Sequence, residues 1–315
     1  MLNDKKFFFI VGTGRNGSQV LREVLNINRD VYVNPETHFL PLFFSKDLDG
    51  LYQVEDILTC LKKMGSKEAN WLQVLANKSR RSQTVIEFEN KVLRYFSGRN
   101  AKLSEIFSVI TSVGSHYSAE FHGDKTPFYG LYADRLKETF PQCKFIWLVR
   151  DLSAVAESMQ RHRGFQKYLE HDSFDPELCH AMVVDREVSE RRYITENYLQ
   201  FATAIESRIK QALLPFSEDT LIVDYSWFCR RPYETLEQLY QFLGIRRNEF
   251  ALRVGSAIVE CKENRDLAPS WVDLKASKSP AFRCCSYTSE AVETRFPILG
   301  NGYQLLRKCL KRIQI

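Results

Sequence analysis

The 315-residue sequence has no long hydrophobic run, no internal repeat and no low-complexity linker. Its longest apolar run near the N-terminus, residues 7–11, is far too short to span a bilayer, so we expect a chain without a membrane anchor. The length suits one large α/β domain or two small ones. We expect a single domain over residues 1–315.

The eight cysteines lack the spacings that metal sites require. There is no CxxC pair, and no group of cysteines has the intervals typical of zinc ligands. We also expect no signal peptide. We therefore expect reduced, mostly buried thiols, a cytoplasmic protein and no bound metal.

The excess of positive over negative charge is small as well. The formal net charge is only +5, and the basic residues are scattered. This distribution predicts a solvated surface rather than a nucleic-acid interface. A modest positive field would still attract an anionic small molecule. The 44% hydrophobic and 26% charged residues are ordinary for a globular protein.

Strand-like apolar runs alternate with amphipathic helical patterns along the chain. The alternation predicts an α/β fold with three layers, in which helices cover both faces of a central parallel sheet. Residues 45–120 carry helical signals without a clear strand, which indicates a helical insertion covering the sheet edge. Residues 265–300 indicate a long loop or lid before a C-terminal helix from about 302. The expected strands are residues 7–11, 31–33, 144–149 and 220–225, with another in the stretch before Gly123. Expected helices include residues 17–26 and the segment that ends at Gly244.

The stretch FFFIVGTGRNGSQVL, residues 7–21, joins an expected strand to an expected helix through three glycines. Free backbone N–H groups at a helix start, approached through glycines, are typical of an anion-binding loop. Gly12, Gly14 and Gly17 match the dinucleotide fingerprint GxGxxG. Glu36 follows Gly12 by 24 residues, roughly where a ribose-binding acid is expected.

Two other templates compete for the same loop. Gly12 and Gly17 have the spacing of a P-loop, but Ser18 stands at the lysine position, which disfavours an ordinary ATPase or GTPase. A third template, that of sulfotransferases, has a basic residue inside the loop, as Arg15 is here. The glycines alone do not choose among the three.

Residues that follow the expected strands should lie together, because ligands of open α/β sheets bind at the carboxyl ends of the strands. These residues carry the cationic side chains Arg15, Lys125 and Arg150 and one prominent carboxylate, Glu36. That is too much positive charge for a nicotinamide site. It suits a ligand with several phosphates.

These segments resemble the sulfotransferases that use 3′-phosphoadenosine 5′-phosphosulfate (PAPS). FIVGTGRNGSQVL is similar to their 5′-phosphosulfate loop. KFIWLVRDLSAVAESM is similar to their 3′-phosphate segment, in which a serine follows the strand-ending arginine by eight positions. PETHF and GDKTPF narrow the resemblance to the branch with tyrosylprotein sulfotransferases and many bacterial enzymes. The resemblance covers residues 7–40 and 123–245 and implies a P-loop nucleoside triphosphate hydrolase-like fold, with helical insertions that form the acceptor site.

The resemblance implies a role for each matching residue. Glu36 would remove the acceptor proton, and cationic side chains would stabilise charge on the departing phosphate without a metal. The glycine-rich C-terminal motif of the vertebrate cytosolic enzymes is absent, which leaves the adenosine-covering segment undefined. The catalytic candidates are Glu36, Lys125, Arg15 and His38. The candidates that hold PAPS, and its product adenosine 3′,5′-bisphosphate, are Gly14, Arg15, Asn16, Gly17, Ser18, Gln19, Arg150, Ser158 and Tyr225.

Several of these residues have a second interpretation. His38 is the other candidate for the base, or it orients Glu36 or the substrate. Arg135, Arg161 and His162 are weaker ligand candidates. In the structural alternatives the candidates have local partners, namely Asp124 for Lys125, Asp151 for Arg150 and the helix backbone for Ser158.

The predicted reaction is sulfuryl transfer from PAPS to a hydroxyl or amine of a small molecule, such as a secondary metabolite, glycolipid or alkaloid. Glu170, Asp172 and Asp175 either meet a cationic acceptor of the saxitoxin type or are solvated. No nucleic-acid or membrane partner is expected, and a homodimer is compatible with these features. The alternatives are a Rossmann-type NAD(P)-dependent oxidoreductase, in which Glu36 holds ribose hydroxyls, and a non-catalytic nucleotide-binding module.

Overall fold

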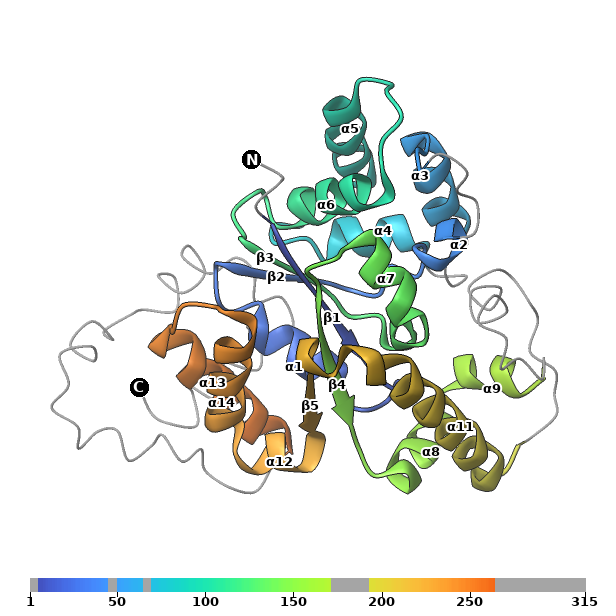
Figure 1. Ribbon diagram of the computed structural model, residues 1–315, viewed down its shortest axis with the longest axis vertical. Helices are drawn as coiled ribbons and strands as arrows, with labels where there is room; N and C mark the ends of the chain where they lie inside the picture. Colours follow the sequence, from blue (N-terminus) through green and yellow to red (C-terminus); the bar gives the residue numbers. More distant parts are fainter. Residues whose placement is uncertain (1–4, 45–49, 65–68, 171–192, 264–315) are drawn as a thin grey trace, which may run out of the picture.

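The computed structural model describes residues 5–44, 50–64, 69–170 and 193–263. In these ranges five strands form one sheet with the order β2-β3-β1-β4-β5 (Figure 1). All the pairings are parallel, so every strand ends at the same edge of the sheet. The strands are β1 (Lys6–Val11), β2 (Val31–Asn34), β3 (Phe121–Asp124), β4 (Lys144–Val149) and β5 (Thr220–Asp224).

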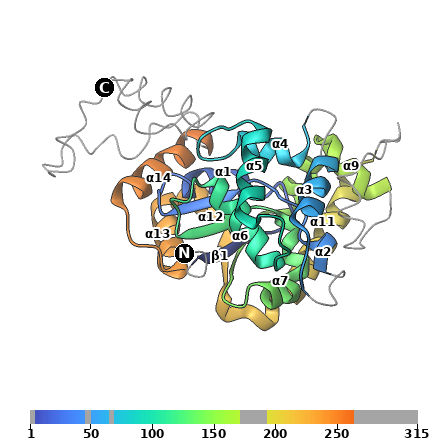
Figure 2. The same ribbon diagram turned by 90° about the horizontal axis from the view of Figure 1, so that it is seen from above.

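Helices cover both faces of this sheet, because side chains of a buried strand point alternately to either side. Phe8 and Ile10 of β1 pack with α1, α12, α13 and α14, whereas Phe9 and Val11 pack with α3 to α9 and α11. Figure 2 shows α13 and α14 on one side of β1 and α3 and α11 on the other. The predicted three-layer α/β/α arrangement is therefore confirmed.

The helices differ in length from one short turn to nineteen residues. Those before the middle of the chain are α1 (Ser18–Leu25), α2 (Pro41–Phe44), α3 (Val54–Lys63), α4 (Trp71–Asn77), α5 (Val85–Phe96) and α6 (Leu103–Gly114). Those that follow are the 3₁₀ helix η1 (Pro127–Tyr132), α7 (Ala133–Thr139), α8 (Leu152–Gln160), α9 (Arg163–Glu170), α11 (Thr195–Leu213), the 3₁₀ helix η2 (Leu214–Asp219), α12 (Tyr225–Arg230), α13 (Pro232–Leu243) and α14 (Glu249–Glu263).

The insertion between β2 and β3 consists of helices and packs against the sheet on the side of β2, which is an edge strand. Helix α6 contacts β2 and β3, and α3 to α6 join the same core cluster as Phe9 and Val11. The insertion thus covers one face of the sheet, next to its β2 edge. The reason is that α6 is buried almost all round, with ten buried residues out of twelve.

Two other expectations concern the end of β5 and the C-terminal segment. Tyr225 begins α12 and does not end β5, because the Oδ1 atom of Asp224 accepts a hydrogen bond from the Trp227 N–H at 2.7 Å and caps the helix. The expected lid at 265–300 and the helix from about 302 lie outside the described residues. Within the described ranges, no helix has both the length and the apolar character needed to cross a bilayer.

Candidate active site

The loop between β1 and α1 is held in a conformation that requires glycine. Gly14 and Gly17 have φ angles of 77° and 91°, and Arg15 between them also has a left-handed φ, 53°. A Cβ atom on Gly17 would lie 2.0 Å from the Tyr225 ring. Helix α1 starts at Ser18, directly after this turn. The loop therefore leads its backbone closely past Tyr225 into a helix N-terminus, as an anion-binding loop does.

The side chain of Asn16 fastens the loop to the neighbouring strand. It is fully buried, and its Nδ2 atom donates to the Leu148 carbonyl of β4 at 2.8 Å. Its Oδ1 atom accepts from the Ser18 N–H at 3.4 Å. The Asn16 side chain, which we expected to help hold PAPS, therefore bonds to the protein through both Nδ2 and Oδ1. The Gln19 amide likewise donates to Glu23, at 2.9 Å.

The predicted 3′-phosphate residues come together with the loop. The Nη1 atom of Arg150 donates to the Arg15 carbonyl at 3.1 Å, and the Nε atom of Arg15 donates to the Ser158 hydroxyl at 3.1 Å. The Arg150 guanidinium lies 4.9 Å from the centre of the Tyr225 ring. We call Arg15, Arg150, Ser158 and Tyr225 the arginine cluster.

These contacts argue against two of the local partners considered in the sequence analysis, Asp151 for Arg150 and the helix backbone for Ser158. Asp151 caps α8, because its Oδ1 atom accepts from the Ala154 N–H at 2.8 Å. Arg150 instead turns toward the loop, as its bond to Arg15 shows. The Ser158 hydroxyl likewise reaches across to Arg15, so it is more than a residue that bonds its own helix.

The second group consists of Glu36, Lys125 and His38. The Nζ atom of Lys125 lies 2.5 Å from Oε1 of Glu36, and Nε2 of His38 lies 3.7 Å from the other carboxylate oxygen. The Lys125 side chain is only 8% exposed, whereas that of Glu36 is 32% exposed. Lys125 thus pairs with Glu36 and not with Asp124. The ring of His38 lies 4.6 Å from the Trp71 ring of α4, centre to centre.

The electrostatics of this group keep Glu36 ionised. Burial alone would raise the pKa of the Glu36 carboxyl, but Lys125 and His38 together hold that pKa below its ordinary value. The carboxylate therefore accepts hydrogen bonds at neutral pH. It still has an exposed portion from which another group can reach it.

The charges of both the arginine cluster and the Glu36 group act on His162. Its pKa is lowered by burial first and then by the charge of Arg15, while the charge of Glu36 acts in the opposite direction. Its ring lies 5.5 Å from that of Phe165, and a Cβ atom on Gly14 would lie 3.1 Å from the same Phe165 ring. The region where α8 passes into α9 therefore lies against the glycine loop. Neither Phe165 nor Trp71 carried a sequence signal.

The weaker candidates lie at the surface in ion pairs of their own. Arg135 pairs with Glu138 at 2.9 Å, and Arg161 pairs with Glu157 at 3.8 Å. Both arginine side chains are more than half exposed, at 53% and 71%. Glu170 accepts a hydrogen bond from Gln166 at 2.8 Å. The other acids considered for a cationic acceptor, Asp172 and Asp175, lie outside the described residues.

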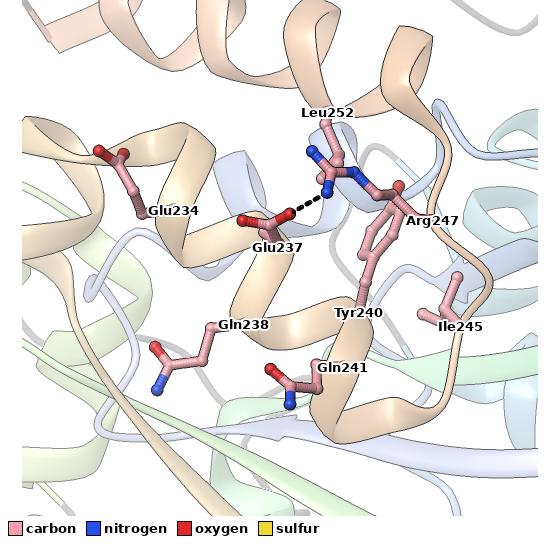
Figure 3. Close-up of a pocket in the computed structure, with 8 residues that line it drawn as sticks. All are labelled: Glu234, Glu237, Gln238, Tyr240, Gln241, Ile245, Arg247 and Leu252. Atoms are coloured by element: carbon pink, nitrogen blue, oxygen red, sulfur yellow. Dashed lines mark ion pairs between the residues drawn. The ribbon is translucent and has the colours of Figure 1, made fainter.

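A cavity of about 390 Å³ lies away from this site, where α13 faces the segment that leads into α14 (Figure 3). Its charged lining residues are engaged with protein groups: Glu237 pairs with Arg247 at 2.9 Å, and Glu234 with Arg231 at 3.5 Å. None of the residues predicted for the site lines it. Its lining is Glu234, Glu237, Gln238, Tyr240, Gln241, Ile245, Arg247 and Leu252.

Comparison with known proteins agrees with this geometry. Residues 8–249 match the model of the sulfotransferase family. A putative protein-tyrosine sulfotransferase of Caenorhabditis briggsae is 24% identical over 157 residues, which are 50% of this chain and 44% of that protein. The match thus spans less than half the length of that relative.

Two solved structures share the fold. The sulfotransferase domain of the Synechococcus PCC 7002 olefin synthase is 22% identical, with a TM-score of 0.52 over 80% of this chain and 76% of that one. The sulfotransferase domain from the curacin biosynthetic pathway is 20% identical, with a TM-score of 0.54 over 80% and 77%. The fold is accordingly the P-loop-like fold of sulfotransferases. Because the family model matches well over half of the sequence, the chain belongs to the sulfotransferase family.

Proposed function

We propose that this protein transfers the sulfuryl group of PAPS to a hydroxyl or amine of a small-molecule acceptor. The observation that carries the proposal is the Glu36–Lys125 pair at the ends of β2 and β3, beside a glycine loop whose arginine contacts Ser158. PAPS is the general donor of the family. The proposal requires one region that binds two phosphate groups and another that takes up a proton.

The arginine cluster supplies the first region. Arg150 and Ser158 bind the 3′-phosphate, which distinguishes PAPS from ATP. The Arg15 guanidinium, already hydrogen-bonded to Ser158, adds a second positive charge there. The loop backbone from Gly14 to Ser18 and the N-terminus of α1 bind the 5′-phosphosulfate through N–H groups. An anion thereby replaces contacts that Arg15 and Arg150 make within the protein.

The second region carries out the transfer. The acceptor oxygen or nitrogen attacks the sulfur in line, its proton passes to Glu36, and the bond between sulfur and the phosphate oxygen breaks. Lys125 lies against Glu36 and is the cation placed to stabilise charge on the departing phosphate. Proton removal by a positioned base contributes roughly 100- to 10,000-fold. His38 orients Glu36 from its other oxygen, with Trp71 behind it.

The Rossmann alternative agrees less well with these contacts. A ribose-binding acid would direct its oxygens at two sugar hydroxyls, but both oxygens of Glu36 face cationic or basic partners. The alternative also does not explain why Arg15 contacts Ser158. We propose further that turnover needs no divalent metal, because Arg15 and Lys125 provide the positive charge.

The acceptor is proposed to be a small molecule, for example a secondary metabolite or alkaloid. The reduced cysteines expected from the sequence support a cytoplasmic site of action, which disfavours secreted protein tyrosines. Incubation with radiolabelled PAPS and a panel of phenols, alcohols, amines, guanidinium alkaloids and a tyrosine peptide tests this proposal. Label in a small acceptor supports it, label only in the tyrosine peptide contradicts the acceptor class, and tight binding of NADP in place of adenosine 3′,5′-bisphosphate contradicts the reaction.

A further inference from the structure

Asp124 is a buried carboxyl with an incomplete set of partners. It is the last residue of β3 and is fully buried. Its Oδ1 atom accepts from the Thr126 hydroxyl at 2.6 Å, while its Oδ2 atom has no hydrogen-bond partner among the residues that the structure describes. A buried carboxyl with a free oxygen is costly, so the position calls for an explanation beyond packing. Asp124 immediately precedes Lys125.

Hydrogen bonds from two separate segments converge on Asp124. The Thr37 N–H donates to the Thr126 hydroxyl at 3.0 Å, so that hydroxyl uses its own proton to bond Asp124. The Thr37 hydroxyl lies 2.7 Å from the Tyr129 hydroxyl, which also accepts from the Leu40 N–H at 3.2 Å. The four side chains of Thr37, Asp124, Thr126 and Tyr129 are all buried, and we call them the threonine bracket.

The threonine bracket joins the two chain segments that carry the reacting groups. Glu36 directly precedes Thr37, and Lys125 lies between Asp124 and Thr126. The Lys125 N–H also donates to the Asn34 carbonyl at 3.3 Å, which ties the same segments together through the backbone. A shift of the bracket would therefore move the Glu36 carboxylate relative to the Lys125 ammonium group.

We propose that Asp124 is a positioning residue that holds Glu36 and Lys125 in their reacting geometry through the threonine bracket. The inference rests on the proposed function, because it assigns Asp124 a task in the same transfer. It goes beyond that function in naming a carboxyl that touches neither donor nor acceptor. Asp124 acts on the pair through its hydrogen bond with Thr126, which Thr37 joins, and through its charge.

The charge state of Asp124 sets how firmly the bracket holds. Burial raises the pKa of Asp124 to about 7, although the Thr126 and Thr37 hydroxyls partly counter this effect. Once ionised, Asp124 accepts a stronger, charge-assisted bond from Thr126, and its negative charge makes Glu36 more basic. Both effects raise the transfer rate as the pH rises through about 7. The titratable groups whose charge acts on Asp124 are Lys125, Glu36, Arg22, Tyr32 and Tyr129.

Three variants of the full chain test the proposal. Asp124→Ala and Thr126→Val each break the bracket, so each should lower kcat by about 10-fold or more, with affinity for adenosine 3′,5′-bisphosphate within about threefold of wild type. The double variant should be no worse than the poorer single one, because both remove one connection. Asp124→Asn keeps the Oδ1 acceptor but cannot ionise, so its rate should lack the rise near pH 7. Transfer from radiolabelled PAPS to the acceptor panel, or to water, is the rate measured.

A carbon NMR titration of Glu36 gives a readout that does not depend on turnover. Loosening the pair with Lys125 should raise the pKa of Glu36 in Thr126→Val, which keeps the Asp124 carboxyl. Asp124→Ala is not used for this readout, because it also removes a negative charge that acts on Glu36. The matched controls Asp134→Ala and Thr139→Val, on α7, should leave the pKa of Glu36 unchanged. An unchanged Glu36 pKa in Thr126→Val, a kcat within about threefold of wild type in both bracket variants, or a pH profile of Asp124→Asn equal to that of wild type overturns the positioning role. A shifted Glu36 pKa in a protein that consumes no PAPS contradicts the proposed function and not the bracket.

Discussion

Lys125 and Glu36 are 89 residues apart in sequence, yet the lysine Nζ atom lies 2.5 Å from the glutamate Oε1 atom. The pair exists because β2 and β3 are parallel neighbours, with Asn34 opposite Asp124 in the register. The residues that follow the two strands consequently leave the sheet side by side. A carboxylate and an ammonium group are thus brought together by the topology of the sheet, and the predictions below depend on that placement.

Loss of Arg150 should weaken binding of the 3′-phosphate specifically. We expect Arg150→Gln to lower the affinity for adenosine 3′,5′-bisphosphate by about 1.5 to 3 kcal/mol, because a charge-assisted contact is lost. Affinity for AMP, which has no 3′-phosphate, should change little. Calorimetry with both nucleotides measures the difference. Arg161→Gln is the matched control, since that arginine pairs with Glu157 at the surface. Equal losses of affinity for both nucleotides would show that Arg150 does not bind the 3′-phosphate.

The glycine loop should tolerate no side chain at Gly17. Gly17→Ala places a Cβ atom 2.0 Å from the Tyr225 ring at a φ of 91°, so we expect both lower stability and loss of nucleotide binding. Gly98→Ala is the matched control, because Gly98 has a φ of 78° but no described residue beyond its chain neighbours lies within 4 Å of the added Cβ. The control should cost about 1 kcal/mol of unfolding free energy from backbone strain alone. Thermal unfolding with and without adenosine 3′,5′-bisphosphate compares the two, and equal behaviour would contradict the close approach.

Asp124 should make the stability of the fold depend on pH. Its folded-state pKa of about 7 lies above the ordinary value of 3.8, so the folded state binds a proton that the unfolded state has released between these values. The contribution of Asp124 to stability therefore falls as the pH rises from about 4 to about 7. Asp124→Asn lacks this dependence. The melting temperature of the variant minus that of wild type should increase from pH 5 to pH 8, and a constant difference would mean that Asp124 titrates normally.

Turnover should continue without divalent metal. Arg15 and Lys125 carry the positive charge that magnesium supplies in nucleotide hydrolases, and Ser18 stands at the P-loop lysine position. We expect equal rates in EDTA and in magnesium buffer. If activity vanished in EDTA and returned with magnesium alone, these side chains would not be sufficient.

Much of the central sheet can be predicted from the sequence, for a physical reason. Buried parallel strands are continuous apolar runs, so FFFIV and KFIWLV indicate β1 and β4 directly. The strand β3 is harder to recognise, because FHGD is short and polar and is buried by the helices of the insertion. The face of the sheet that the insertion covers could not be predicted, since helical periodicity shows which face of a helix is apolar but not what that face packs against.

Within the site, the sequence predicts which residues matter better than how they interact. The glycine loop, Glu36 and Lys125 follow expected strands, so their proximity could be inferred. The bond from Arg15 to Ser158 joins residues 143 apart and depends on the exact course of the loop. Asp124 was considered only as a partner for Lys125, because hydrogen bonds among Thr37, Thr126 and Tyr129 leave no pattern in the sequence.

The most direct test of the account is the rate of Glu36→Gln. Glutamine keeps the shape and the hydrogen-bonding reach of Glu36 but cannot take up the acceptor proton. We predict that the per-turnover rate with PAPS falls by about 100-fold or more, while affinity for adenosine 3′,5′-bisphosphate stays within about threefold. His38→Ala is the internal comparison, and it should be milder because His38 reaches the acceptor through Glu36. A Glu36→Gln enzyme that turns over within about threefold of wild type while His38→Ala is inactive would make His38 the base. Loss of nucleotide binding with an intact per-turnover rate would contradict the assignment of Glu36 to proton removal altogether.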